Sequence, residues 1–542
     1  STCMNMDGVM KNTMDRRRIF RLTRQSGFLW KSAGVLGALL LVIGTAISFL
    51  NTDRLDLFRE LATAPDLSDE LGIDIKGLTD DKLDPKRITD TLLQSLESDA
   101  PFYTRLMDVS YMLLYIEPKT AIDLPIIGNL NSNQQAIAQG LVDCYAGPDK
   151  KTNIQTLEKL AEGDAPRDAN FALAIVRLDR KDGLQSVEAL YREIELYDSR
   201  YPREQLVEIY LELEKFELLN ALSKDPKYRE FFTYSVRHEI AVQCLDWPMI
   251  VKTLLPAAYE NVRIGIVVLA LISGLMWAVI LIRFSGHFSK VWKFLLPALV
   301  LGAFSAHATL LSYIWQVDQM GFGFGQTLYQ QLLFCLSIGL REEFLKLLLF
   351  VPLIPFLRNK EDLAILTIAG LVGLGFAIEE NVNYFNSSAG LSAIGRFATA
   401  NFLHIALTAM CGLTLTRAVY HRGEDLQHAA STFVLAVAIH GFYDAFIMVP
   451  ALINFSWLTY TVFVLMGYQY FGWLQHLREE WKDTFSITAT FTYGIIVVAG
   501  LTYILFAWEV GPSLALQGIV GEVIGTAIIL IMFYREIPET IE

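Results

Sequence analysis

Cysteine and charge are both scarce in this sequence of 542 residues, and each shortage excludes a class of protein. The five cysteines form no CxxC pair and show no zinc-like spacing, which argues against a structural zinc site made of thiolates. Cys144 and Cys244 share one segment, where they either pair in an oxidising compartment or remain two buried free thiols. Only 19% of the residues are charged and 53% are hydrophobic, so a single soluble domain is excluded and membrane helices are indicated.

Most of the net charge of −13 lies in one segment. Between Asn51 and Val262 about 38 acidic residues face about 24 basic ones, and the rest of the chain is close to neutral. This acidic segment has no field that would attract nucleic acid or an anionic membrane surface.

The chain begins with a basic stretch, followed by an apolar run from Ala33 to Leu50 that is long enough to cross a bilayer. Small residues near its end, Ala46 and Ser48, leave signal-peptide cleavage open, but the length of the run favours a retained membrane helix.

The acidic segment, residues 51–262, has helical periodicity without any run that could span a membrane. A faint repeat of roughly 33 residues places Leu178, Leu213 and Leu245 at similar points of paired helices, which predicts a tetratricopeptide-like stack. Ordinary amphipathic helical hairpins would give much the same pattern.

Nine further apolar segments follow Arg263, so the sequence predicts an all-α, polytopic membrane helix bundle of about ten transmembrane helices with the acidic helical domain inserted. The predicted segments are about 264–282, 294–315, 327–357, 363–385, 391–416, 429–449, 452–474, 486–508 and 513–534. Basic residues occupy every second loop, at Arg283, Lys290 and Lys293; Arg358 and Lys360; Arg417 and Arg422; Arg478 and Lys482; and Arg535. The positive-inside rule therefore places both termini in the cytoplasm and residues 52–262 on the outer side.

The predicted domains follow from these segments. They are a cytoplasmic basic N-terminus (1–32), a first membrane helix (33–50), an exoplasmic acidic helical domain (51–262), a membrane bundle (263–534) with its core at about 326–449, and a cytoplasmic tail (535–542).

Nine ionisable side chains lie within four consecutive predicted membrane helices, where each charge costs at least ~2.5 kcal/mol near the bilayer centre. They are Glu342, Glu343, Lys346, Glu379, Glu380, Arg396, His404, His440 and Asp444. Spacings of four residues put Glu342 with Lys346, and His440 with Asp444, on common helix faces. We expect these groups to converge in one cavity and to provide the side chains that a hydrolytic site needs. By contrast, His307 and Glu522 have no evident partners in their helices and are expected to be local packing residues.

Three motifs in this set resemble those of the PrsW family of intramembrane proteases. Arg341–Lys346 is similar to the family's EExxK motif, Phe376–Asn381 to FxxxE, and His440–Asp444 to HxxxD, with His404 in the intervening helix. The related CAAX prenyl endopeptidases have other residues at positions 346, 380 and 444, so the resemblance favours the PrsW branch.

The resemblance implies an endopeptidase of the bacterial cytoplasmic membrane that cleaves a membrane-spanning regulatory protein, such as an anti-sigma factor. In this hypothesis Glu342 or Glu343 activates water and Glu380 relays the proton. His440, Asp444 and His404 stabilise the oxyanion, and Lys346 keeps one glutamate ionised. Phe376, Asn381 and Arg396 support the site. The expected partners are the substrate and the lipid bilayer, without nucleic acid, and no cofactor is expected.

Two alternatives remain open at this stage. The same glutamate, histidine and aspartate side chains could hold zinc in a metallopeptidase, although the sequence has no HExxH. A transporter or receptor could use them as a proton relay, but the sequence lacks the inverted symmetry typical of such proteins.

Overall fold

The computed structural model describes residues 21–50, 85–116, 121–146, 153–285, 288–421, 424–477 and 486–537, and every regular element in these ranges is helical. Contacts divide the chain into two compact units: residues 75–260, and the rest. The predictions for residues 1–20 and 51–84, for Arg422, Arg478 and Lys482, and for most of the tail concern residues outside the described ranges.

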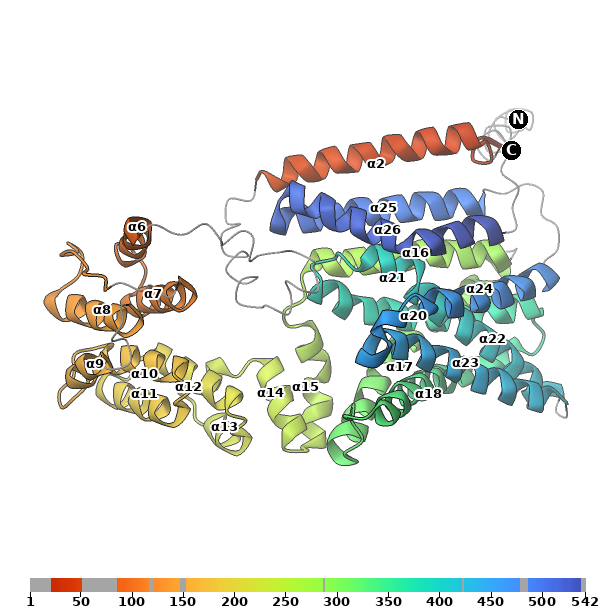
Figure 1. The fold of residues 1–542 in the computed structure, drawn as a ribbon. Helices are drawn as coiled ribbons and strands as arrows, with labels where there is room; N and C mark the ends of the chain where they lie inside the picture. Colours follow the sequence, from red (N-terminus) through yellow and green to blue (C-terminus); the bar gives the residue numbers. More distant parts are fainter. Residues whose placement is uncertain are drawn as a thin grey trace, which may run out of the picture. The chain divides into compact units, whose positions relative to one another are not determined.

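The second unit, called the membrane unit here, contains the long apolar helices (Figure 1). These are α2 (Ser26–Ser48), α16 (Ile264–Ser285), α17 (Phe288–Ile314), α18 (Leu328–Phe350), α20 (Asp362–Ser387), α22 (Ala400–His421), α23 (Glu424–Met448), α24 (Leu458–Leu477), α25 (Ile487–Val510) and α26 (Pro512–Glu536). Short elements join them: η2 (Trp315–Gln319), η3 (Val351–Leu353), α19 (Ile354–Leu357), α21 (Ala393–Ala398) and η4 (Pro450–Phe455). In the described residues, eight spans are long and apolar enough to cross a membrane. The prediction of an all-α polytopic bundle is confirmed.

The inner helices of this bundle are α20 and α22. About 83% of the most apolar stretch of α20, and of the span Ala393–His421 that contains α22, is buried inside the protein, against 17% for α2. Helices α16, α17 and α22 pack around α20, while α2 lies along α25 on one side of the unit (Figure 1). Because α20 and α22 are shielded from lipid, polar side chains on them can contact other helices without facing hydrocarbon.

Glycines bring the helices of the bundle into close contact at two crossings. A Cβ atom at Gly339 of α18 would lie 2.7 Å from the carbonyl oxygen of Val437, and one at Gly441 of α23 would lie 2.8 Å from Cα of Leu336. At the second crossing, a Cβ atom at Gly373 of α20 would clash with the carbonyl oxygen of His404. Only glycine permits backbones to approach so closely, as is common where membrane helices cross.

The other unit, residues 75–260, is a set of shorter helices around its own hydrophobic core. They are α6 (Pro85–Leu96), α7 (Phe102–Ile116), α8 (Ser132–Tyr145), α9 (Ile154–Leu160), α10 (Ala169–Asp179), α11 (Gly183–Tyr197), α12 (Arg200–Glu212), α13 (Phe216–Leu222), η1 (Arg229–Phe231), α14 (Tyr234–Gln243) and α15 (Trp247–Tyr259). Both cysteines of this unit are free: Cys144 is buried and Cys244 is exposed.

Three helices of this unit end in the same way. After α10, α12 and α14, the residues Lys181, Glu214 and Leu245 adopt positive φ angles of 63°, 53° and 53°. In each case the next amide donates to a carbonyl five residues back, as in a Schellman cap. The equivalent positions are therefore Lys181, Glu214 and Leu245, so only Leu245 of the three predicted leucines occupies such a position. The tetratricopeptide-like stack itself stays a prediction.

Glu193 of α11 is a fully buried carboxyl group at the N-terminus of α10. Its Oε1 accepts a hydrogen bond from the Asp168 amide at 2.8 Å. Burial raises the pKa of Glu193 to about 7, although the backbone amides of Asp168, Asn170 and Phe171 oppose this rise. The carboxyl group therefore favours its protonated form more strongly in the folded unit than in an unfolded chain.

We predict that a fragment of residues 75–260 loses stability as the pH rises from about 4.5 to about 7, the window set by the raised pKa of Glu193. In this window the unfolded chain has released the proton that the folded chain still holds, so a higher pH favours unfolding. The free energy of unfolding, measured by urea titration, should fall by roughly 1–3 kcal/mol.

The Glu193→Gln fragment should lose most of this pH dependence, since glutamine does not titrate. Glu195→Gln, which changes an exposed glutamate on the same helix, is the matched control and should keep it. Equal pH dependence in the Glu193→Gln and unaltered fragments would contradict this assignment.

Candidate active site

Helix α18 carries two buried glutamates and a buried lysine. Lys346 and Glu343 have no exposed surface, and Glu342 is 7% exposed. The Lys346 ammonium donates to Glu343 Oε1 at 2.7 Å and lies 3.7 Å from Glu342 Oε2. Spacings of three and four residues bring these groups together on one face of the helix.

The Lys346 ammonium also contacts two neighbouring inner helices. Its Nζ lies 2.8 Å from Nδ1 of His404 on α22 and 4.2 Å from the ring centre of Phe376 on α20. An ammonium can only donate, so Nδ1 of His404 accepts and its Nε2 carries the hydrogen. That hydrogen points to Glu380 Oε2 at 3.0 Å. Both nitrogens of His404 are therefore engaged.

His440 of α23 is oriented by the second glutamate. Its Nδ1 lies 2.8 Å from Glu343 Oε1, and because a carboxylate accepts, Nδ1 carries the hydrogen. Its Nε2 then faces Glu342 Oε2 at 3.5 Å and Asp444 Oδ2 at 3.6 Å. Neither oxygen has a hydrogen-bond partner among the described residues. Three acceptor atoms thus face one another, and a proton, a water molecule or a cation placed between them would stabilise this arrangement.

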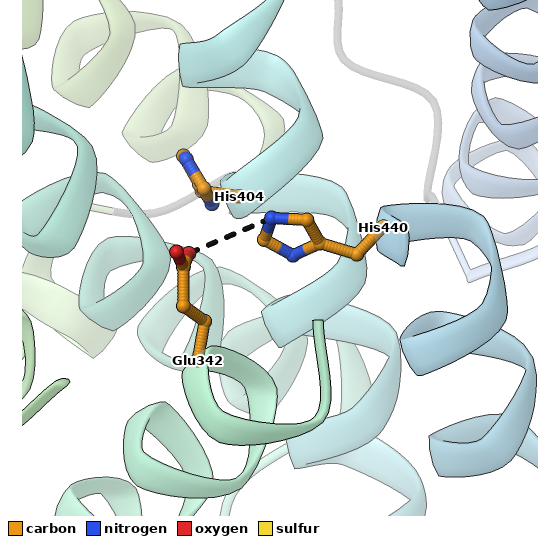
Figure 2. A group of neighbouring side chains, drawn as sticks. All are labelled: Glu342, His404 and His440. Atoms are coloured by element: carbon orange, nitrogen blue, oxygen red, sulfur yellow. Dashed lines mark ion pairs between the residues drawn. The ribbon is translucent and has the colours of Figure 1, made fainter. Parts of the chain in front are cut away.

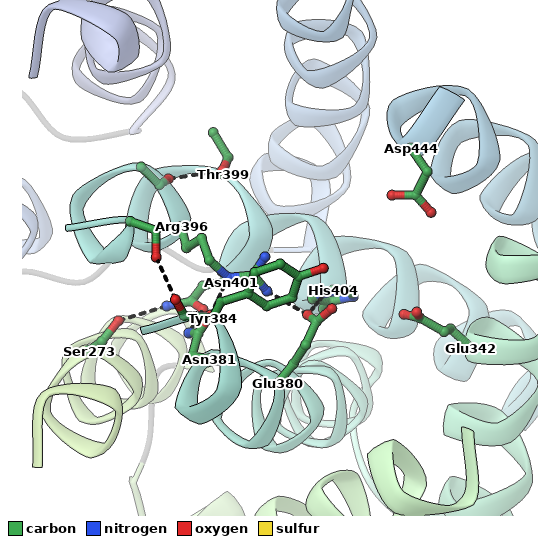
Figure 3. A network of polar contacts seen from close by, with 12 residues as sticks. Ser273, Glu342, Glu380, Asn381, Tyr384, Arg396, Thr399, Asn401, His404 and Asp444 are labelled. Atoms are coloured by element: carbon green, nitrogen blue, oxygen red, sulfur yellow. Dashed lines mark hydrogen bonds and ion pairs between the residues drawn. The ribbon is translucent and has the colours of Figure 1, made fainter. Parts of the chain in front are cut away.

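Glu380 also forms an ion pair with Arg396 (Figure 3). Arg396 donates from Nη2 to Glu380 Oε2 and from Nε to Asn381 Oδ1, both at 2.6 Å. Asn381 donates to Asn401 Oδ1 at 2.7 Å, and Asn401 donates to Ser273 Oγ at 2.9 Å. This chain of hydrogen bonds links α21 to α20, α22 and α16.

The polar cluster is defined here as Glu342, Glu343, Lys346, Glu380, Arg396, His404, His440 and Asp444. With all four carboxyl groups ionised and both histidines neutral, it would carry four negative charges against the two positive charges of Lys346 and Arg396. An uncompensated charge in a low-dielectric interior is costly. Two protons or one divalent cation would bring the cluster to neutrality.

Glu342, His404 and His440 could hold a metal ion. One ligand atom from each of them lies within 4.8 Å of the others (Figure 2). The unpartnered Oε2 of Glu342 and the Nε2 of His440 suit a divalent cation, and Glu343 would orient His440 behind it. To ligate a metal, His404 would have to give up its contact with Lys346 or Glu380.

The structure brings all ten predicted site residues into or beside this cluster, with two changes in detail. Arg396 and His404 were expected on one continuous helix, but the helix is interrupted at Thr399, between α21 and α22. The two side chains therefore reach Glu380 from separate helices. Glu379, expected in the same set, pairs with His307 of α17 at 3.1 Å, so His307 does have a partner.

Sequence reasoning missed Asn401 and Ser273, which complete the support of Asn381. Both are fully buried. The available signal was an amide in the middle of the predicted apolar segment 391–416, since a buried amide needs hydrogen-bond partners.

Comparison with known proteins agrees with the motifs. Residues 290–469 match the family model described as the PrsW family intramembrane metalloprotease. No curated protein and no solved structure matches the chain. The matched range contains the whole polar cluster and favours a peptidase over a transporter. Residues 290–469 are therefore similar to the PrsW family of intramembrane proteases, which indicates a peptidase, and the chain is a multi-pass membrane protein.

Proposed function

We propose that this chain is an endopeptidase that cleaves a membrane-tethered regulatory protein, such as an anti-sigma factor, with water activated in the polar cluster. The observation that carries the proposal is the group of unpartnered oxygens on Glu342 and Asp444 around Nε2 of His440. Asp444 and Glu380 lie in the last third of α23 and α20, which supports cleavage near one membrane face.

In the proposed mechanism, Glu342 is the general base that takes a proton from water. Glu343 holds His440 in one orientation through Nδ1, so that Nε2 is directed at the same point. A protonated His440, flanked by Glu342 and Asp444, would donate to the tetrahedral oxyanion. Glu380, fixed by Arg396 and His404, relays the proton to the leaving amine. In this route, protons rather than a metal ion neutralise the excess negative charge of the polar cluster.

A second candidate mechanism uses a divalent metal ion, and the description of the family as metalloproteases favours it. Glu342, His404 and His440 would hold the ion, which would supply Lewis-acid polarisation and a more acidic bound water. Glu343 would act as the orienting partner of His440, and Asp444 would accept from the water. Lys346 would compensate the negative charge that the ion leaves on Glu343.

The proposal includes an orientation in a bacterial cytoplasmic membrane, with both termini in the cytoplasm and residues 52–262 outside. Ion pairs support it, because they gather the basic loops at one end of the bundle. Lys290 pairs with Glu361 at 2.7 Å, and Arg417 pairs with Asp362. The ring of Trp30 near the start of α2 lies 5.7 Å from the ring of Tyr534 near the end of α26, so these two helix ends lie at the same face of the bundle.

Glu342→Gln and His440→Ala are each expected to reduce cleavage by roughly 10²–10⁴-fold, because glutamine cannot accept the proton and alanine cannot hold the water or oxyanion. The assay incubates the purified protein with single-pass membrane proteins from the same genome and identifies the cut by mass spectrometry. Glu379→Gln is the matched control, a neighbouring intramembrane glutamate that pairs with His307 instead. Wild-type cleavage by both test variants would show that the polar cluster takes no part in the reaction.

Metal content separates the two mechanisms. The proton-balanced route predicts full activity after exhaustive chelation and no stoichiometric metal in the purified protein. The metal route predicts about one divalent ion per chain, its loss in Glu342→Gln and His440→Ala, and activity that returns with added zinc. Inductively coupled plasma mass spectrometry on the same preparations measures this directly.

The orientation predicts that protease added to right-side-out spheroplasts digests residues 52–262, while a tag on either terminus is digested only after lysis. Immunoblots against the two terminal tags and the acidic segment give the readout. Protection of the acidic segment in intact spheroplasts would show the opposite topology.

A further inference from the structure

A pocket in the unit of residues 75–260 has no role in the proposed hydrolysis. It has a volume of about 500 Å³ and is lined by residues of α13, α14, the start of α15 and the segment between α13 and α14. In Figure 1 these helices follow one another along the chain. The volume is typical of pockets that take small ligands or a few residues of a peptide. Its lining residues are Asn220, Ser223, Lys224, Pro226, Arg229, Arg237, Ile240, Ala241, Cys244, Asp246 and Met249.

Three basic side chains line this pocket: Lys224, Arg229 and Arg237. No carboxylate in the described part of the chain forms an ion pair with any of them. Elsewhere in the unit, some basic side chains have acidic partners, as Arg177 does with Glu158 and Arg203 with Asp198. The pocket therefore gathers three cations that have no ion-pair partner among the described residues.

The one carboxylate in the lining is already engaged. Asp246 caps α15 by accepting a hydrogen bond from the Met249 amide at 3.2 Å. Arg237 donates to the carbonyl oxygen of Arg229 at 3.3 Å, which holds it at the pocket while leaving its other donors available. The pocket thus offers positive charge and hydrogen-bond donors to a ligand.

The floor of the pocket is apolar. Ile240 and Ala241 are 6% and 2% exposed, and Met249 and Pro226 add apolar surface around them. A bare inorganic anion would leave this surface uncovered, whereas an aliphatic chain that bears carboxylates would cover the floor and reach the cations.

We propose that this pocket binds a ligand with carboxylate groups on an apolar chain. Such chemistry occurs in an acidic peptide segment and in a free dicarboxylic acid. The proposal does not depend on the peptidase assignment, since it concerns residues of the other unit only.

Cys244 in the lining gives a direct readout of occupancy, because it is exposed whereas Cys144, Cys335 and Cys411 are buried. The full chain, carrying Cys3→Ser because Cys3 lies outside the described residues, is purified in non-ionic detergent. The rate of Cys244 alkylation by a maleimide is then measured in the presence of each of three compounds. These are the acidic peptide acetyl-Asp-Leu-Glu-amide, its uncharged analogue acetyl-Asn-Leu-Gln-amide, and adipate.

We expect the acidic peptide or adipate to slow alkylation of Cys244 at least about fivefold at saturation, and the uncharged peptide to have no effect. The triple variant Lys224→Gln, Arg229→Gln and Arg237→Gln should weaken this binding at least about tenfold, because it removes three charge-assisted contacts. The matched control neutralises three exposed cations elsewhere in the unit, Lys159→Gln, Arg167→Gln and Arg192→Gln, and should bind like the unaltered chain.

Tighter binding of the acidic peptide would identify a peptide segment as the ligand, and tighter binding of adipate would identify a free dicarboxylic acid. Three outcomes would overturn the proposal: no protection by either carboxylate ligand, equal protection by the uncharged peptide, or an equal loss in the control triple variant. Unchanged alkylation rates of both triple variants without ligand verify that the pocket is still folded.

Discussion

The membrane unit depends on one buried cation, the ammonium of Lys346. It has no exposed surface, and it contacts Glu343 and Glu342 on its own helix, His404 on α22 and the Phe376 ring on α20. Removal of one partner from a buried ion pair typically costs about 3–5 kcal/mol, because the remaining charge is left uncompensated. The contacts of Lys346 also fix the hydrogen positions on His404, and through Glu343 they fix those on His440. The protonation pattern of the site follows from this single charge.

Close helix crossings make that pattern rigid. Gly339 and Gly441 bring α18 against α23, so that Glu343 and His440 lie within hydrogen-bond distance. Gly373 does the same for α20 and α22, where Glu380 meets His404. Catalytic groups held on packed helices need little reorganisation during the reaction. Two close helix pairs and one lysine thus define the positions of the groups in the polar cluster.

The sequence predicted much of this site because membrane burial makes charge informative. A glutamate or lysine within an apolar helix needs a partner, and spacings of three or four residues identified Lys346 with Glu342, and His440 with Asp444. The sequence could not reveal the break at Thr399, because the apolar run continues through it. The His307–Glu379 pair joins separate helices, which periodicity within one helix does not report. Asn401 and Ser273 are polar but uncharged, so they gave a weaker signal. In the acidic unit, the pocket is formed by side chains from four short elements, and no local pattern places them together.

The four charged residues of α18 also bear on how the protein enters the membrane. Arg341, Glu342, Glu343 and Lys346 lie within one 23-residue helix, and α18 is absent from the eight described spans that are apolar enough to cross alone. On a biological insertion scale each such residue near the helix centre opposes transfer by ~2.5–3.5 kcal/mol. The translocon would therefore retain α18 until later helices are synthesised, since His404 and His440 follow it in the chain. Biogenesis of this protein should depend on delayed, cooperative integration of α18 with α20, α22 and α23, so a ribosome stalled before α23 would leave the paired glutamates outside the lipid phase.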